Sequence, residues 1–226
     1  MIDDLIRRGD LKGLLAAAKE FHGHICPYVA IGIRASLIGM ERLGVSRLNF
    51  EESIEERIMA IVECNNCFLD GVQIATGCTV GNNSMVYLDL GKNALTLVKR
   101  KDWEGVRIYV DSDAIRDRYF PEEALALFDK VVVRREGTPE EVSTLNEKWE
   151  QIGYTMLELP EDEFQVQSVK VAPLEPAPIF RSVRCSSCGE LTMEIRVVHV
   201  EGKPYCLRCA KRSFHAVIGR GIEEMQ

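Results

Sequence analysis

Two closely spaced cysteine pairs near the end of the chain constrain its fold more than any other feature. Cys185 and Cys188 form the first pair, Cys206 and Cys209 form the second, and seventeen residues separate the pairs. Each tight CxxC turn brings two thiolates within reach of one ion, and two such turns complete a tetrahedron. The spacing therefore predicts a zinc ribbon in which one structural zinc ion is held by all four cysteines.

A proline-rich stretch separates this ribbon from the rest of the chain. Residues 172–178 contain three prolines, which favour an extended and semi-rigid spacer. We therefore expect a larger domain over residues 1–171, a linker over 172–178 and the ribbon over 179–226. Because a module of about 45 residues buries little core, metal binding is expected to supply much of its folding energy.

Composition and charge limit which cellular compartment and which kinds of partner we expect. The first residues are acidic and lack the basic segment of a secretory signal, and no stretch reaches the roughly 20 apolar residues of a membrane span. These features predict a cytoplasmic protein without membrane contact, where eight cysteines indicate metal or redox chemistry rather than structural disulfides. The net charge of −7 disfavours nucleic acid as a partner.

Hydrophobic periodicity and turn residues predict an α+β first domain. Expected helices cover residues 3–20, 27–43, 68–75, 114–119, 121–134 and 139–152. Expected strands cover residues 57–63, 85–90, 94–99, 106–110 and 164–171.

A second group of soft metal donors lies in this first domain. His22, His24 and Cys26 fall within five residues, directly before the helix that Pro27 opens. Helix N-termini lower the pKa of a nearby thiol, so we expect a reactive Cys26. The remaining donors are Cys64, Cys67 and Cys78. All six are candidate ligands of a second transition metal, and Cys64-x-x-Cys67 also fits a thiol redox pair between a strand and a helix.

Four ordered motifs give the chain a resemblance to a known family. They are Phe21-His22-Gly23-His24-x-Cys26-Pro27, Cys67-x-x-Asp70-Gly71-x-Gln73, Thr76-Gly77-Cys78-Thr79-x-Gly81-Asn82 and Gly91-Lys92. Over roughly residues 15–135 the chain resembles FmdE-like proteins, named for the FmdE component of molybdenum/tungsten formylmethanofuran dehydrogenase. It departs from the family at Tyr28, where glycine is common, and Cys64 lies outside the motifs.

The resemblance implies a thioredoxin-like mixed sheet flanked by helices, with a metal-binding cleft lined by the His/Cys motif. It also implies a homodimer, a role in anaerobic C1 metabolism, and a partner such as a molybdenum/tungsten dehydrogenase complex. It establishes no reaction. Candidate catalytic residues are His24, Cys26, Cys67 and Lys92. Lys92 would offer a positive charge to an anionic substrate or partner, or else it is a solvated lysine in a turn. Asp70 would either orient a ligand or cap its own helix.

Three functions follow from these features. The leading hypothesis is a metal-binding accessory or redox component of the FmdE type, with a His/Cys metal cleft and a structural zinc ribbon. The second is a thiol–disulfide oxidoreductase that uses Cys64 and Cys67. The third is a regulator whose ribbon docks onto a protein or, less in keeping with the charge, onto nucleic acid.

Overall fold

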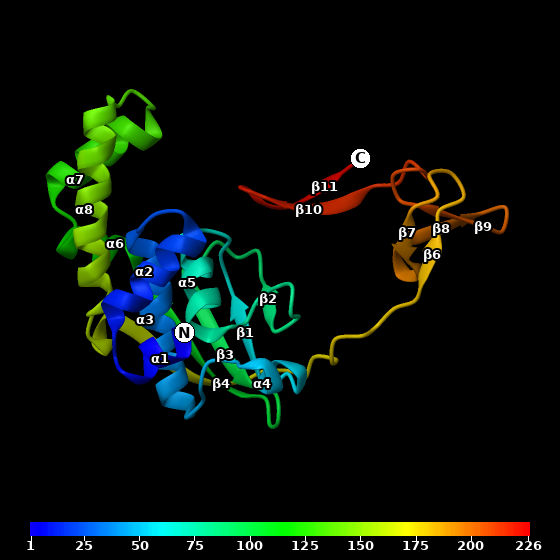
Figure 1. Ribbon diagram of the computed structural model, residues 1–226, viewed down its shortest axis with the longest axis horizontal. Coiled ribbons are helices and arrows are strands. Elements are labelled where there is room, and N and C mark those ends of the chain that lie inside the picture. Colours follow the sequence, from blue (N-terminus) through cyan, green and yellow to red (C-terminus); the bar gives the residue numbers. More distant parts are fainter. The chain divides into compact units, whose positions relative to one another are not determined.

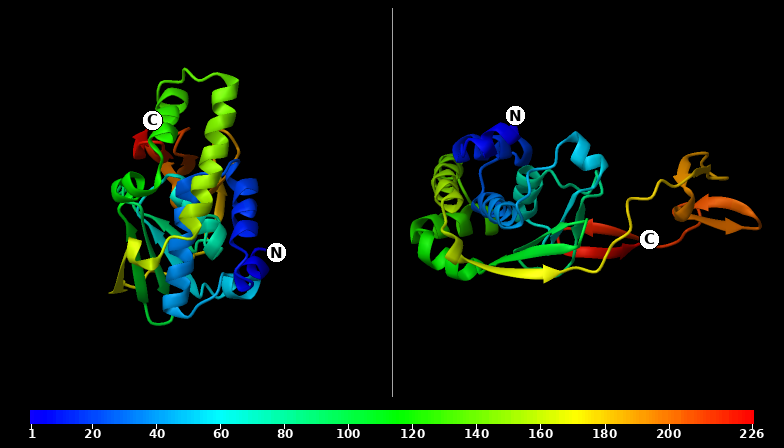
Figure 2. Two further views of the ribbon diagram at one scale, coloured as in Figure 1. Left: turned by 90° about the vertical axis from the view of Figure 1, so that its left-hand side faces the viewer. Right: turned by 90° about the horizontal axis from the view of Figure 1, so that it is seen from below.

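The computed structural model describes residues 1–226, which form two compact units, Met1–Pro173 and Leu174–Gln226. Figures 1 and 2 show the elements of each unit. The first unit is a mixed sheet flanked by helices, as predicted. None of the helices in the chain combines the length and apolarity that a bilayer crossing requires.

The sheet of the first unit has five strands in the order β2-β1-β3-β4-β5. Its strands are β1 (Ile58–Val62), β2 (Met85–Tyr87), β3 (Ala94–Lys99), β4 (Glu104–Val110) and β5 (Phe164–Lys170). Only the β1–β2 pair is parallel, with Ile61 opposite Val86, and the other three pairings are antiparallel. Every residue of β1 is buried, which explains its continuous apolar run in the sequence.

Eight α-helices complete the first unit. They are α1 (Ile2–Arg7), α2 (Leu11–His22), α3 (Pro27–Leu43), α4 (Phe50–Ile54), α5 (Cys67–Thr76), α6 (Ser112–Tyr119), α7 (Glu122–Phe128) and α8 (Pro139–Leu157). A π-helical turn, η1 (Asp129–Val133), follows α7, and a 3-10 turn, η2 (Glu161–Glu163), precedes β5. The prediction of one helix over residues 3–20 is wrong, because left-handed Gly9 ends α1 and Asp10 caps α2 through the amide of Gly13.

Helices α3 and α5 pack in direct backbone contact (Figure 1). A Cβ atom on Gly32 of α3 would lie 2.1 Å from the carbonyl oxygen of Phe68, and one on Gly71 of α5 would lie 2.1 Å from that of Val29. Glycine is therefore required on both sides of this contact. The contact lies near the first turns of both helices and so holds their N-termini side by side.

The second unit consists of short hairpins (Figure 2). Strand β6 (Ser182–Arg184) pairs with β7 (Leu191–Met193), β8 (Val197–Val200) with β9 (Lys203–Cys206), and β10 (Phe214–Ile218) with β11 (Gly221–Met225). The 3-10 turn η3 (Glu194–Arg196) separates β7 from β8.

Candidate functional site

The candidate site of the first unit is built where two helices begin and one ends. Helix α2 ends at His22, and left-handed Gly23 turns the chain toward His24. Cys26 is the N-cap of α3, with Pro27 at its first position. Cys67 is the first residue of α5, which Asn66 caps by accepting a hydrogen bond from the amide of Phe68. Helix caps and turns formed by neighbouring residues thus position each side chain, and the packing of α3 on α5 brings these side chains together.

Three of the predicted ligands lie within reach of one ion. The ligand atoms of His22, His24 and Cys26 all lie within 4.8 Å of one another. The two imidazole rings are 4.7 Å apart between centroids. The Cys67 thiol lies beside this group, close enough to Cys26 for the two thiols to shift each other's pKa. We call these four residues the His/Cys cluster.

Asp70 fixes the orientation of His22. The Nδ1 atom of His22 lies 2.7 Å from Oδ2 of Asp70, whose other oxygen accepts a hydrogen bond from Gln73 Nε2 at 3.1 Å. A carboxylate at this distance keeps the imidazole proton on Nδ1, which leaves a lone pair on Nε2. The Nε2 atom is buried and has no hydrogen-bond partner. Buried polar atoms are normally paired, so this nitrogen is a candidate metal ligand.

The two thiols of the cluster have unequal pKa values. The hydrogen bond from Cys26 lowers the pKa of Cys67 to about 6. The same hydrogen bond, together with burial, raises the pKa of Cys26. The expectation of a lowered pKa at Cys26 is therefore wrong, because Cys26 donates its proton to Cys67 and its helix N-terminus does not compensate. Burial lowers the pKa of His24.

Three further predicted residues lie outside the cluster. Cys78 is fully buried beyond the last turn of α5, and the ten residues of that helix separate it from Cys67 by about 15 Å. Cys64 is also buried, its thiol donates to Asn66 Oδ1 at 3.5 Å, and burial raises its pKa to about 11. Lys92 is exposed, and its amide donates to the carbonyl of Glu63.

A cavity of about 830 Å³ opens beside the cluster and is lined at one end by His24, Cys26 and Cys67. Its apolar walls come from α6, α7, η1 and α8 and from Phe120 between α6 and α7. The aromatic lining residues are Phe120, Phe128 and Trp149, and the aliphatic ones are Leu125, Val131, Val132, Val142 and Leu145. Tyr28, Arg116 and Asn146 are its other polar lining residues. Tyr28, the position that departs from the family, thus borders the cavity next to Cys26.

Comparison with protein families identifies the first unit. The family described as FmdE, Molybdenum formylmethanofuran dehydrogenase operon, matches residues 21–165, well over half of the chain. The chain belongs to the FmdE family. The match begins at Phe21, immediately before His22, and includes the whole His/Cys cluster.

Two relatives extend the comparison. A protein of Archaeoglobus fulgidus with the name "Probable S-adenosyl-L-methionine-binding protein" is 60% identical over 212 residues, which are 94% of this FmdE-family chain and 56% of the relative. The chain thus spans just over half the length of that relative. The crystal structure of a tungsten formylmethanofuran dehydrogenase FmdE-like protein from Syntrophus aciditrophicus has a TM-score of 0.57 and 24% identity, covering 88% of this chain and 91% of that one. This second likeness shows the fold.

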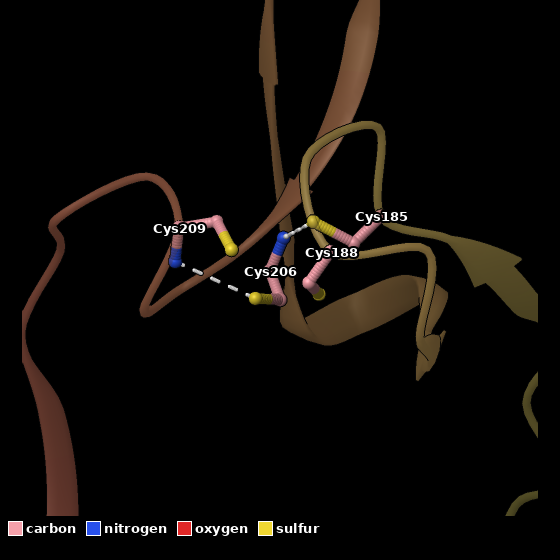
Figure 3. A group of neighbouring side chains, drawn as sticks. All are labelled: Cys185, Cys188, Cys206 and Cys209. Atoms are coloured by element: carbon pink, nitrogen blue, oxygen red, sulfur yellow. Dashed lines mark hydrogen bonds between the residues drawn. The ribbon is translucent and has the colours of Figure 1, made fainter.

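The four cysteines of the second unit fit a structural zinc site (Figure 3). Their sulfur atoms lie within 4.8 Å of one another, and residues 178–213 match the prokaryotic dksA/traR C4-type zinc finger. The amide of Cys206 donates to Cys185 Sγ at 3.3 Å, and that of Cys209 to Cys206 Sγ at 3.5 Å. Backbone amides of Cys188 and Cys206 lower the pKa of Cys185 to about 6, which favours the thiolate that zinc requires.

Sequence reasoning missed the walls of the cavity in this FmdE-family protein. Trp149, Val142 and Val131 are distributed over α8 and η1, and each carries the apolar side chain that any amphipathic helix would show. Only the abundance of apolar residues in the segment 125–133, which is more than one helical face needs, could have indicated a second apolar surface.

Proposed function

We propose that this FmdE-family protein binds a transition-metal ion through His22, His24 and Cys26, with Cys67 as the adjoining fourth donor. We further propose that it serves as an accessory or redox component, related to the FmdE component of formylmethanofuran dehydrogenase, in anaerobic C1 metabolism. The observation that carries the metal site is the buried and unpartnered Nε2 of His22. Asp70 holds the proton on the other nitrogen, so this lone pair is available beside two further donors.

The donor set limits which ions fit. Two imidazoles and two thiols are soft or intermediate ligands, which suit zinc, nickel, copper(I) or iron rather than magnesium or calcium. Such an ion supplies a Lewis acid or a redox centre when bound. The chain's own residues have three roles. Asp70 orients His22, whereas Cys26 and Cys67 share one proton that a bound metal would displace. The apolar walls of the cavity exclude water.

The thiol–disulfide alternative is less well supported by the thiol pairing. The Cys67 thiol hydrogen-bonds to Cys26, whereas Cys64 is buried and donates to Asn66. A redox pair needs an attacking thiol of low pKa next to its resolving thiol; Cys67 meets the first condition, but Cys26 rather than Cys64 is the thiol that shifts its pKa. Insulin reduction by the wild type that is lost in Cys64→Ser would favour this alternative again.

The ligand named for the Archaeoglobus relative calls for a separate proposal. S-adenosyl-L-methionine carries an ammonium and a sulfonium group, and no carboxylate lines the cavity to pair with either charge. About 44% of the relative's length lies outside the stretch that aligns with this chain. We therefore propose that its ligand binds in that other region. Calorimetric titration of this chain with S-adenosyl-L-methionine should show no heat of binding, and saturable heat would refute the assignment.

Partners of the chain are also proposals. We propose a homodimer that docks onto a dehydrogenase complex and uses the zinc unit as a rigid protein-binding surface. Leu191 and Met193 of β7 are more than half exposed there, as a docking surface requires. Sedimentation equilibrium tests the dimer, and a purified dehydrogenase tested against Leu191→Glu and wild type tests the docking surface.

Metal content tests the central proposal. Anaerobically purified wild type should hold two metal ions per chain by mass spectrometry, one in each unit. His24→Ala/Cys26→Ser should lose one ion, and Cys206→Ser/Cys209→Ser should lose the other. Cys64→Ala is the matched control, since that buried thiol lies outside the cluster, and it should keep both ions. Retention of both ions by the His24/Cys26 variant would refute the site.

A further inference from the structure

The cavity beside the His/Cys cluster carries more apolar surface than the fold needs. Six of its eight apolar lining side chains are not fully buried, and Val132 and Val142 are 46% and 50% exposed. Leaving apolar area in water forfeits about 25 cal/mol per Å², so a concave apolar surface of this kind is typical of a binding site. Its volume of about 830 Å³ lies within the usual range for small-molecule pockets.

We propose that this cavity binds an uncharged, carbon-rich small molecule whose polar group faces Cys26 and Cys67. The inference rests on the proposed function, because it names the ligand class of the same metal site. The charge of the cavity, the nature of its walls and its inner end each support this ligand class.

The cavity contains no uncompensated charge outside the cluster. No aspartate or glutamate lines it, and Arg116 is its single lysine or arginine. The guanidinium of Arg116 is already paired with Asp113 at 2.9 Å and with Asp117 at 3.5 Å. A charged ligand body would lose its hydration here without gaining a partner, which disfavours its binding. Phosphate esters and other polyanions are therefore the wrong class.

The walls are rigid and partly aromatic. Trp149 stacks on Phe128 with 5.3 Å between ring centroids and an interplanar angle of 23°, and Phe120 meets Trp149 edge-on at 5.7 Å. The turn after Phe128 is the π-helical η1, a rare element that is frequent at functional sites. Stacked rings and a fixed turn give the ligand a preformed surface, which lowers the entropy cost of binding.

The burial of Cys26 argues for a small molecule rather than a second protein chain. A protein partner would cover the exposed Val132 and Val142 but would not reach the buried Cys26, which also lines the cavity. A small ligand fills the depth of the cavity and brings its polar group to the thiols. Tyr28 also lines the cavity, and its phenol hydroxyl can hydrogen-bond the polar group of the ligand.

Two fluorescent probes test the ligand class directly on the full chain. N-phenyl-1-naphthylamine is neutral, and 1-anilinonaphthalene-8-sulfonate has the same ring skeleton with one added negative charge. We expect saturable binding of the neutral probe with quenching of tryptophan emission, and binding of the anion about tenfold weaker or more, equivalent to about 1.4 kcal/mol. The chain has two tryptophans. Quenching should disappear in Trp149→Phe and persist in Trp103→Phe.

A pair of matched variants locates the probe. Val142→Glu places a charge at the cavity wall and should weaken binding of the neutral probe about tenfold. Val133→Glu changes a valine that is 63% exposed and does not line the cavity, and it should leave binding unchanged. Thermal melting shows whether each variant is folded.

The possible outcomes separate this inference from the proposed metal site. No saturable binding of the neutral probe, equal binding of the anion, or equal effects of the two glutamates would overturn the ligand class. Metal content is measured in the same samples. Probe binding to a protein that holds no metal in the first unit would refute the metal site alone, and retained metal without probe binding would refute the ligand class alone.

Discussion

The substitution Gly71→Ala tests whether one backbone contact assembles the candidate site. The new methyl group would lie 2.1 Å from the carbonyl oxygen of Val29 and 2.8 Å from the amide nitrogen of Ile33, both on α3. Both obstacles are backbone atoms, so no change of side-chain rotamer relieves them. Helices α3 and α5 would have to separate by about 1 Å to reach an ordinary contact distance.

The expected magnitude follows from two opposed effects. Overpacking of this kind costs about 1–3 kcal/mol, and the upper value applies because the obstacles are backbone atoms. Alanine in a helix interior is about 1 kcal/mol more favourable than glycine. The net loss in free energy of unfolding is therefore about 2 kcal/mol. Metal ligands tolerate errors of only about 0.2 Å, so moving Cys67 away from Cys26 should weaken metal binding by more than the loss of stability alone.

Urea denaturation and chelator competition measure the two effects on Gly71→Ala. The control is Gly81→Ala, because a Cβ at Gly81 meets only Thr79 Oγ1 at 3.9 Å and its backbone needs no left-handed conformation. That variant should match the wild type or gain up to about 1 kcal/mol from a less flexible unfolded chain. Wild-type stability together with wild-type metal affinity in Gly71→Ala would refute the reasoning.

Three further substitutions or treatments test other parts of the structure. Asp70→Asn should keep the fold but lower metal affinity about 10- to 100-fold in chelator competition, because the proton on His22 Nδ1 loses its carboxylate; unchanged affinity would remove Asp70 from the site. In metal-free protein, alkylation of Cys67 by iodoacetamide should rise through a midpoint near pH 6, since the thiolate dominates above its lowered pKa, and peptide mass spectrometry reads the site; a midpoint above pH 8 would contradict the Cys26 hydrogen bond. Arg107→Met should cost about 3–5 kcal/mol in denaturant unfolding, because it strands the buried carboxylate of Glu63, to which Arg107 donates at 2.6 and 2.8 Å; a loss below about 1 kcal/mol would show that water reaches Glu63.

The parts of the site that local sequence determines could be predicted. His22, His24 and Cys26 are near neighbours in the chain, so the end of one helix and the start of the next bring them together whatever the rest of the fold does. The helix over 27–43 is rich in small residues, which favour a close-packed partner, and Gly32 supplies that contact. Pro27 and Gly44 bound this helix as the capping rules predict.

The remaining parts depend on distances that sequence spacing does not give. Cys78 follows Cys67 by only eleven residues, but those residues form a helix that carries the two thiols to opposite ends. The short helix α4 was missed because Phe50 and Ile54 are exposed and show no apolar period. The cavity requires α7 to pack on α8 and α8 to pack on α3, and the second of these contacts joins segments far apart in the chain.

The α3–α5 contact also explains why thiols are suited to this position. Cys26 and Cys67 stand at the N-termini of two helices, and each such end favours negative charge by about 0.3–1 kcal/mol. In the absence of metal the pair holds one proton between two sulfur atoms, and the two helix ends reduce the cost of removing it when a cation binds. The donors thus sit on the best-packed part of the unit, whereas the cavity walls come from the outer elements α6, α7, η1 and α8. Substitutions in those outer elements can change the ligand while leaving the cluster intact, so the preference for a ligand and the affinity for a metal should vary independently in this protein.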